Sequence, residues 1–189
     1  LMLSVPTKPD WLTFTDLGLG KGTLSGTPDN SNIGAHSVVI TVSDGKTPIN
    51  QPFTLNVVNK NDPPEITSTP ILTVHEDALY SYEIVATDPD INDQLTYSAP
   101  TSPAWLTLDP TTHVLSGTPK DGDVGDHDVV IEVTDGLVTV DQPFTITVNN
   151  VNDVPVITDQ RALVIDEDNG FILALTDLTV IDEDNTSEE

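Results

Sequence analysis

The sequence predicts an all-β protein made of tandem β-sandwiches, and three observations support this. Short runs alternate apolar and polar residues, as in Tyr80/Tyr82/Ile84/Ala86 and Val129/Ile131/Val133, so each strand presents one apolar face. The 15 prolines and 11 glycines fit many short strands joined by turns. Blocks of sequence also recur along the chain. Because each apolar face needs a second sheet to cover it, a sandwich follows.

The repeat has a length of 91 residues, the spacing between Gly26 and Gly117 and between Asp62 and Asp153. Upstream the spacing is 94 residues, as between Trp11 and Trp105, so the first copy has three extra residues in a turn. We expect residues 1–64 to be the C-terminal part of one repeat, 65–155 a complete repeat, and 156–189 the N-terminal strands of a further repeat.

Within the complete repeat the pattern predicts seven short strands and no helix. Turn residues such as Asp109-Pro110 and Asp135-Gly136 separate them. The predicted strands are Ile71 to His75, Tyr80 to Ala86, Leu95 to Ser98, Trp105 to Leu108, His113 to Leu115, Asp128 to Val133 and Phe144 to Asn149.

Composition limits the possible partners. The chain carries 31 Asp and Glu against 6 Lys and Arg, a net charge of -25, which repels nucleic acids and anionic membrane surfaces and favours cations. Cysteine is absent, which excludes disulfides, thiolate metal sites and a cysteine nucleophile. No run of about 18 apolar residues occurs, so we expect no membrane insertion in this fragment.

Two short segments suggest a calcium site. Asn59-Lys60-Asn61-Asp62-Pro63-Pro64 recurs as Asn150-Val151-Asn152-Asp153-Val154-Pro155, each time directly after an alternating strand pattern. Each segment carries carboxylate and amide oxygens beside a proline that ends strand pairing. Calcium takes six to eight oxygen ligands of these types. The sequence therefore predicts calcium where one repeat meets the next.

Several motifs of the complete repeat resemble a known family. They are Pro103-Ala104-Trp105-Leu106, Leu115-Ser116-Gly117-Thr118-Pro119, Val124-Gly125, Val133-Thr134-Asp135-Gly136 and Asn150-Val151-Asn152-Asp153. In these motifs the chain resembles the dystroglycan-type cadherin-like repeats, also described as Ig-type repeats, of large bacterial surface or secreted proteins. The resemblance implies seven-stranded Greek-key β-sandwiches, calcium between repeats, and adhesion or extension at the cell surface.

The resemblance also implies two ligand sets. For the second joint, where the repeats 65–155 and 156–189 meet, the matching positions are Glu76, Asp121, Asp123, Asn150, Asn152, Asp153, Asp182 and Asp184. For the first joint they are Asn61, Asp62, Asp88, Asp90 and Asp135. We expect the first joint to bind calcium more weakly, because Asn30 and Asn32 stand where the family has acidic residues. As isolated residues these acids would be solvated loop side chains, but their repetition favours a metal.

Other readings of single residues are weaker. An EF-hand loop would begin at Asp88, but Asp93 then occupies the place of the required glycine. Trp11 and Trp105 could stack on sugars, yet their shared repeat position favours a sandwich core. His36 and His127 also recur, and we expect them to cover a sheet edge or bond a neighbouring carboxylate.

Catalysis is not expected. Ser25 and Ser116 lie in Leu-Ser-Gly, but the Gly-x-Ser-x-Gly pattern of serine hydrolases is not met. A glycosidase needs two carboxylates facing each other in a cleft, whereas these acids gather at repeat ends.

The predicted function is therefore a calcium-stabilised adhesion or extension module of a bacterial extracellular protein, attaching cells to cells or surfaces. Its expected partners are calcium and other cadherin-like repeats, through self-association, or surface glycans. The alternative is a carbohydrate-binding or spacer module attached to a secreted polysaccharide-degrading enzyme. One further hypothesis is that residues 156–189 of one molecule complete the first repeat of the next, in a head-to-tail contact.

Overall fold

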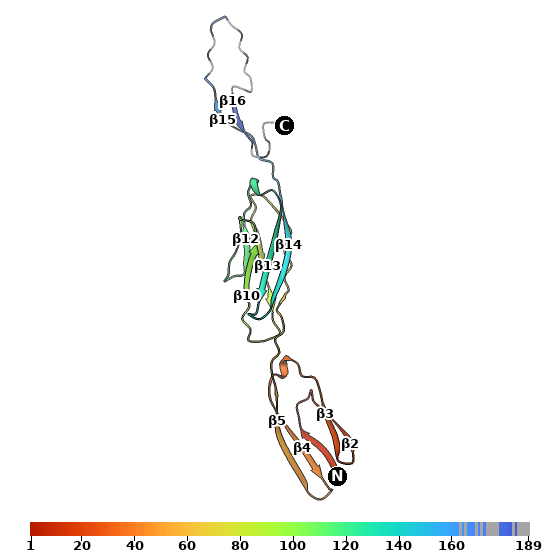
Figure 1. Cartoon of the computed structure of the whole chain (residues 1–189). Helices are drawn as coiled ribbons and strands as arrows, with labels where there is room; N and C mark the ends of the chain where they lie inside the picture. Colours follow the sequence, from red (N-terminus) through yellow and green to blue (C-terminus); the bar gives the residue numbers. More distant parts are fainter. Residues whose placement is uncertain are drawn as a thin grey trace. The chain divides into compact units, whose positions relative to one another are not determined.

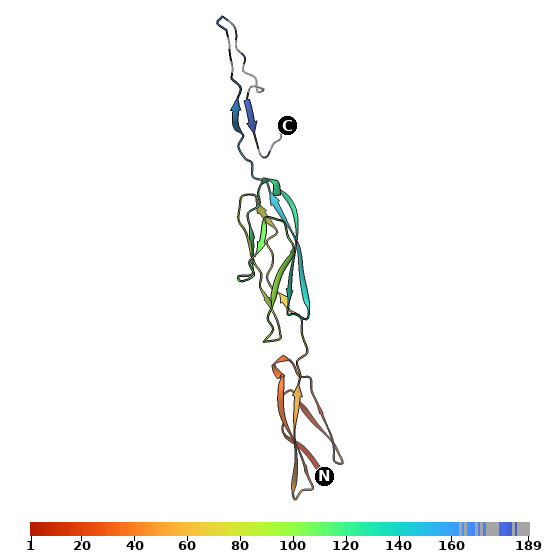
Figure 2. The same cartoon turned by 60° about the vertical axis from the view of Figure 1, so that its left-hand side comes forward.

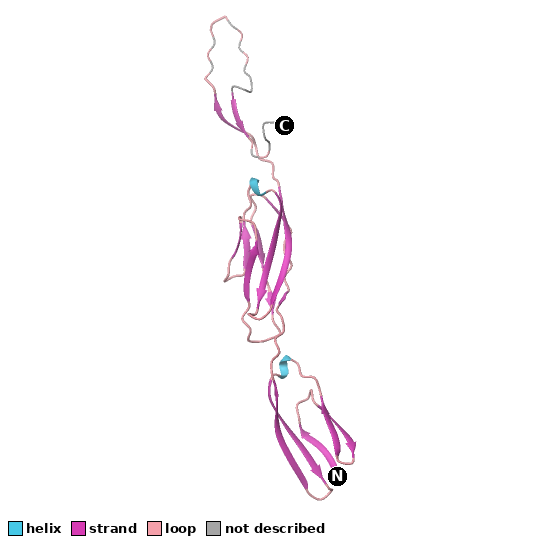
Figure 3. Cartoon of the chain, in the orientation of Figure 1, coloured by secondary structure: helices cyan, strands magenta, loops and turns pink. Residues whose placement is uncertain are grey.

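The computed structural model describes residues 1–162, 164, 166–168, 170, 172, 178–182 and 184 (Figure 1). The chain divides into two compact units. The first holds Leu1–Pro63 with the loop Asp88–Asp93, and the second holds Pro64–Thr87 with Gln94–Glu189. The all-β prediction is confirmed, since strands form nearly all of the regular structure (Figure 3). None of the helices in the described part of the chain has the length and apolarity needed to cross a membrane.

The first unit is built from two small sheets. One has the strand order β1-β4-β5, and the other pairs β2 with β3. The strands β4 and β5 pair along their whole lengths as an antiparallel ribbon. The elements are β1 (Met2–Thr7), β2 (Thr13–Gly18), β3 (Lys21–Ser25), the 3-10 helix η1 (Asn30–Asn32), β4 (Gly34–Ser43) and β5 (Pro48–Val57).

The second unit contains the repeat predicted to be complete, followed by a two-stranded ribbon. Its elements are β6 (Glu65–Ile66), β7 (Thr73–His75), β8 (Tyr80–Glu83), β9 (Ala86–Thr87), β10 (Thr96–Thr101), β11 (Leu106–Leu108), β12 (Val114–Gly117), the 3-10 helix η2 (Asp121–Asp123), β13 (Gly125–Thr134), β14 (Thr139–Asn149), β15 (Val156–Gln160) and β16 (Leu178–Ile181).

Two sheets face each other in this repeat. One has the order β10-β13-β14-β7, with β7 parallel to β14, and the other has the order β11-β12-β8. Figures 1 and 2 both show β13 and β14 side by side along the repeat. The chain enters through β6, which pairs with β9, and then crosses to the other sheet as β7. This crossing places the residues that follow β7 next to the end of β14.

Each of the seven predicted strands contains or overlaps an observed strand, but several bounds differ; β14, for example, begins at Thr139 rather than Phe144. The two-residue strand β6 has too short a pattern to be predicted. The predicted strand Tyr80 to Ala86 is interrupted between β8 and β9. The strand β13 begins at Gly125 rather than Asp128, because its polar first residues pair with β14 through the backbone. The two 3-10 helices were not predicted either, and each is only three residues long.

The core of the second unit follows the predicted alternation. Tyr80, Tyr82 and Ile84 pack with Ile131 and other buried side chains of the opposite sheet. Trp105 is partly buried against this cluster, with its ring edge-on to Tyr80 at 6.1 Å. The interpretation of Trp105 as a core residue, rather than a sugar platform, agrees with this packing.

The first unit is less tightly covered at equivalent positions. Val38 is fully buried like its counterpart Val129, but Ile40 is only half-buried where Ile131 has no exposed surface. The reason lies in the second sheet. In the second unit β12 has both β11 and β8 as neighbours, whereas in the first unit β3 pairs with β2 alone within the described residues.

The repeated Leu-Ser-Gly-Thr-Pro motif has a packing role. A Cβ atom at Gly117 would lie 2.0 Å from the carbonyl oxygen of Trp105, and one at Gly26 would lie 2.2 Å from that of Trp11. Only glycine allows the tryptophan backbone to approach this closely. The glycine beside each serine is therefore explained by the fold, without a nucleophile.

The last described ribbon pairs β15 with β16 in antiparallel fashion. The rest of the predicted third repeat lies largely on residues 163, 165, 169, 171, 173–177, 183 and 185–189, which are outside the described residues. The head-to-tail hypothesis therefore stays a prediction.

Candidate metal centre

Three carboxylates of the second unit converge from distant parts of the sequence. Glu76 directly follows β7, Asp121 begins η2, and Asp184 lies shortly after β16. One carboxylate oxygen of each lies within 4.8 Å of the others. The set joins two residues of the second predicted repeat with one residue of the third, and its role as a calcium site stays a prediction.

Glu76 is the most buried member, with only 3 % of its surface exposed. Its Oε1 accepts a hydrogen bond from the backbone N–H of Val151, in the segment that follows β14. Its Oε2 is buried and has no hydrogen-bond partner within the described residues. A buried carboxylate oxygen that lacks a donor is costly, so this atom calls for a positively charged or donating ligand.

Asp184 repeats this pattern. Its Oδ2 accepts a hydrogen bond from the backbone N–H of Asp153, while its Oδ1 is buried without a partner in the described part of the chain. The N–H of Asp184 donates in turn to Oδ1 of Asp182 at 3.2 Å. Backbone hydrogen bonds thus fix the orientation of Asp184 and leave one oxygen of its carboxylate without a donor among the described residues.

The cluster is electrostatically unfavourable by itself. Two like charges about 5 Å apart repel by about 3 kcal/mol at an effective dielectric constant of about 20. A single hydrogen bond to a charged group returns only about 1.5–3 kcal/mol. The nearby cation Lys120 forms an exposed ion pair with Asp77 at 2.6 Å, which is a weak contribution to the site. The donor set, which is oxygen only, fits a hard divalent cation such as calcium.

A histidine forms a hydrogen bond to the helix η2, which carries Asp121. Nε2 of His127 donates to the carbonyl oxygen of Asp123 at 2.6 Å, and the His127 ring packs edge-on against Trp105 at 5.9 Å. His36 makes the equivalent contacts, to the carbonyl oxygen of Asn32 and to the ring of Trp11. We expected these histidines at a sheet edge or on a carboxylate; instead each bonds a helix carbonyl, which makes it a support for the acidic loop.

A second acidic cluster lies in the first unit, on the loop Asp88–Asp93. Carboxylate oxygens of Asp88, Asp90 and Asp93 lie within 4.8 Å of one another. Asp90 is 4 % exposed, and its N–H donates to Oδ1 of Asp88 at 2.8 Å. Oδ2 of Asp88 is buried without a partner among the described residues. This cluster has the same donor chemistry as the first one.

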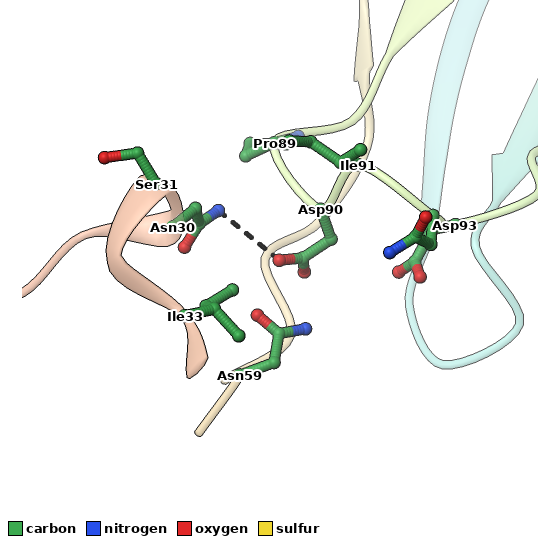
Figure 4. Close-up of a pocket in the computed structure, with 9 residues that line it drawn as sticks. Asn30, Ser31, Ile33, Asn59, Pro89, Asp90, Ile91 and Asp93 are labelled. Atoms are coloured by element: carbon green, nitrogen blue, oxygen red, sulfur yellow. Dashed lines mark hydrogen bonds between the residues drawn. The ribbon is translucent and has the colours of Figure 1, made fainter. Parts of the chain in front are cut away.

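The loop faces a pocket whose wall includes η1. Asn30, Asn59, Asp90 and Asp93 are among the lining residues (Figure 4). Figure 4 shows the Asn30 side chain directed at the Asp90 carboxylate. Nδ2 of Asn30 donates to Oδ1 of Asp90 at 3.3 Å and to Oδ2 of Asp62 at 3.0 Å. The N–H of Asp62 donates to the other oxygen of Asp90 at 2.8 Å.

The structure brings only some of the predicted ligands together. The carboxylate of Asp123 accepts a hydrogen bond from the N–H of Lys120 and caps η2, outside the cluster. Asp135 caps the β13–β14 turn by accepting from the N–H groups of Leu137 and Val138 at 2.7 Å. The roles of Asp123 and Asp135 as ligands stay predictions.

The two segments 59–64 and 150–155 are the linkers, and their asparagine side chains have local hydrogen-bond partners. Nδ2 of Asn61 donates to the carbonyl oxygen of Asp62 at 3.1 Å, and Nδ2 of Asn152 donates to that of Asp153 at 2.6 Å. Each of these bonds ties the amide to a backbone carbonyl oxygen of its own linker. Asn150 lies directly after β14, at the start of the same segment.

Sequence reasoning missed one member of the cluster formed by Asp88, Asp90 and Asp93. Asp93 was considered only as an obstacle to an EF-hand, although the spacing Asp-x-Asp-x-x-Asp places three carboxylates on one short loop. That spacing was a signal that could have identified it.

Comparisons with known proteins agree with the fold. Mouse protocadherin-24 EC1-3 is 13% identical, with a TM-score of 0.56, over 97% of this chain and 67% of that one. Human protocadherin-24 EC1-2 is 13% identical, with a TM-score of 0.50, over 80% of this chain and 82% of that one. Both show the same cadherin-like β-sandwich fold.

The chain also matches part of the structure of an enzyme. The endo-fucoidan hydrolase MfFcnA4 of glycoside hydrolase family 107 is 25% identical over 85% of this chain, with a TM-score of 0.41. This chain spans 26% of that protein, and 24% of its H294Q form. No curated protein matches the sequence significantly.

The family comparison covers most of the chain. The profile described as "Putative Ig domain" matches residues 2–58 and again residues 63–149. Both matches contain the strand pattern and turns described above. The chain therefore belongs to this Ig-domain family.

Proposed function

We propose that the chain is a calcium-stabilised, cadherin-like adhesion and extension module of a large extracellular bacterial protein, of the dystroglycan type. Its repeats would run over residues 1–64, 65–155 and 156–189. In this proposal it is a non-catalytic part that connects a cell to other cells or to a surface.

The observation that carries the proposal is the Glu76, Asp121 and Asp184 cluster. Three carboxylates lie together, and two of their oxygens are buried without a donor in the described part of the chain. Two of the carboxylates also accept backbone hydrogen bonds from the linker, at Val151 and Asp153. A cation held here would therefore act directly on the linker between the second and third predicted repeats.

Calcium would supply the positive charge that these oxygens lack. The residues Glu76, Asp121 and Asp184 would be its ligands, with Asp153 and Asp182 beside them. Their repulsion without a cation favours opening of the linker, and a shared cation favours one closed arrangement. The cluster Asp88, Asp90 and Asp93 is the second candidate site. Rigid linkers suit a protein that transmits a pull between two surfaces.

Isothermal calcium titration of the purified chain tests this proposal. We expect saturable binding with a Kd of roughly 10⁻⁴ to 10⁻³ M, the range of extracellular calcium modules. Glu76→Gln removes a ligand charge and should weaken or abolish this binding. Glu83→Gln is the matched control, because it removes the same charge from an exposed side chain of β8. Absence of calcium binding by the unmodified chain would reject the proposal.

A further experiment separates adhesion from glycan binding. Calcium-dependent self-association in analytical ultracentrifugation, without signal on a glycan array, supports adhesion. Glycan binding that survives chelation would instead favour a carbohydrate-binding or spacer module of a polysaccharide-degrading enzyme.

A further inference from the structure

Each acidic cluster contains an aspartate that contacts a linker aspartate, and these two contacts form a matched pair of equivalent residues. Asp62 and Asp153 are 91 residues apart, and Asp90 and Asp184 are 94 residues apart. In each contact the backbone N–H of the linker aspartate, Asp62 or Asp153, donates to Oδ2 of its partner, Asp90 or Asp184. The same backbone scaffold therefore presents the same carboxylate in both units.

The surroundings of the two contacts differ at the position that holds Asn30 in the first unit and Asp121 in the second. The Asn30 amide donates to Oδ1 of Asp90 and to Oδ2 of Asp62, so both oxygens of Asp90 accept hydrogen bonds. The ionised side chain of Asp121 has no donor. The corresponding Oδ1 of Asp184 is buried and unpartnered within the described residues.

We propose that the Asn30 amide takes the place of a cation in the first unit, so that the contact among Asn30, Asp62 and Asp90 forms without calcium. The equivalent contact between Asp153 and Asp184 needs calcium. The calcium half of this inference rests on the proposed function. The chain would thus combine a permanent contact with a switchable one.

The charges around the two contacts support this difference. Replacing a carboxylate by an amide removes one negative charge and adds two donors at the same place. Asp88 and Asp93 still form an acidic group with Asp90, so the first unit keeps a candidate cation site on its loop. The inference concerns only the side of Asp90 that faces η1.

Amide hydrogen exchange, measured by NMR on the full chain, tests the difference at two matched protons. In the unmodified protein with chelator, the N–H of Asp62 should be protected and the N–H of Asp153 should exchange rapidly. Added calcium should protect Asp153 and change Asp62 little. Equal protection of both protons in chelator would overturn the inference.

Reciprocal substitutions make the test specific. Asp121→Asn should slow exchange of the Asp153 N–H in chelator by about tenfold or more, since it supplies the missing donor. Asn30→Asp should accelerate exchange at Asp62 in chelator by a similar factor. If Asn30→Asp fails to fold, Asp121→Asn still decides, because it gains a contact rather than losing one. Unchanged exchange in Asp121→Asn overturns the inference.

The control is the next pair of equivalent positions on the same 3-10 helices. Asn32 and Asp123 each accept a hydrogen bond from the N–H of the residue three positions earlier, at the start of their own 3-10 helix. Asn32→Asp and Asp123→Asn make the same charge changes and should leave exchange of both protons in chelator unaffected. Effects in chelator equal to those at Asn30 and Asp121 would overturn the inference.

The measurements in chelator and in calcium test the two proposals separately. Loss of calcium binding with the expected exchange changes in chelator rejects the proposed function and keeps the amide contact. Calcium binding without those exchange changes rejects the amide contact alone.

Discussion

Glu76 accepts a hydrogen bond from the backbone N–H of Val151 through one carboxylate oxygen, while its second oxygen is buried without a partner among the described residues. This single side chain therefore connects the end of β7 to the segment after β14 and leaves one charge uncompensated. The relationship explains why a linker residue and the residue that follows β7, which are 75 positions apart, depend on each other.

Glu76→Gln should stabilise the chain in the absence of calcium. The substitution keeps an acceptor for Val151, removes the repulsion from Asp121 and Asp184, and adds a donor to the cluster. We expect the melting temperature in chelator to rise by about 3 °C, and the further rise on adding calcium to be lost. Scanning calorimetry in both buffers measures this. A lower melting temperature in chelator would show that repulsion among the three carboxylates does not limit the stability of the calcium-free protein.

Gly117→Ala should destabilise the second unit by about 2 kcal/mol or more, because the new methyl group would lie against the Trp105 carbonyl oxygen. Gly122→Ala is the control, since a Cβ there meets nothing within 4 Å and the backbone is not left-handed. Urea unfolding of the two variants compares them. Equal stability of both variants would contradict the packing explanation of the Leu-Ser-Gly motif.

Ile131→Ala and Ile40→Ala should differ although the residues occupy the same repeat position. Ile131 is fully buried and Ile40 half-buried, so the losses should be roughly 3–4 and about 1–2 kcal/mol in the free energy of unfolding. Denaturant titration followed by NMR resolves the two units. Equal losses would mean that the first unit is covered as completely as the second.

Tyr80 should make the free energy of unfolding depend on pH in the alkaline range. Burial, with a smaller contribution from Tyr82, raises the pKa of Tyr80 from 10.0 to about 12, so folding favours the protonated phenol. Its contribution is complete below pH 10 and is lost as the pH rises through about 12. Tyr80→Phe removes the hydrogen bond to the Ile71 carbonyl oxygen and should cost about 1 kcal/mol at pH 7. Its unfolding free energy should fall less steeply than that of the unmodified protein between pH 10 and 12.

Most of the fold was predictable because its strands bury one face. The alternation at Tyr80 and Tyr82, and at Val129 and Ile131, directly reflects the buried core. The strand β6 could not be predicted, since two residues carry no periodicity. The 3-10 helices could not be predicted either, because three residues are too few for a periodic pattern. Side-chain capping and a hydrogen bond from a histidine to each helix hold these turns in place.

The candidate site was predictable in part. Repetition of the acidic linker identified Asp153, and the family resemblance identified Glu76, Asp121 and Asp184, which the structure brings together. The position of Asp123, two residues after Asp121, did not reveal that its carboxylate caps the helix, because that depends on where each side chain points. Such directions are set by backbone geometry and not by residue type.

The most direct test of the calcium proposal is an NMR titration that follows the backbone N–H signals of Val151 and Asp153. The proposal predicts that both signals shift together and saturate, with a midpoint at roughly 10⁻⁴ to 10⁻³ M calcium. The shifts should be absent in Glu76→Gln and present in Glu83→Gln. Signals of Val151 and Asp153 that stay unmoved up to about 10⁻² M calcium, well above that range, would contradict the proposal.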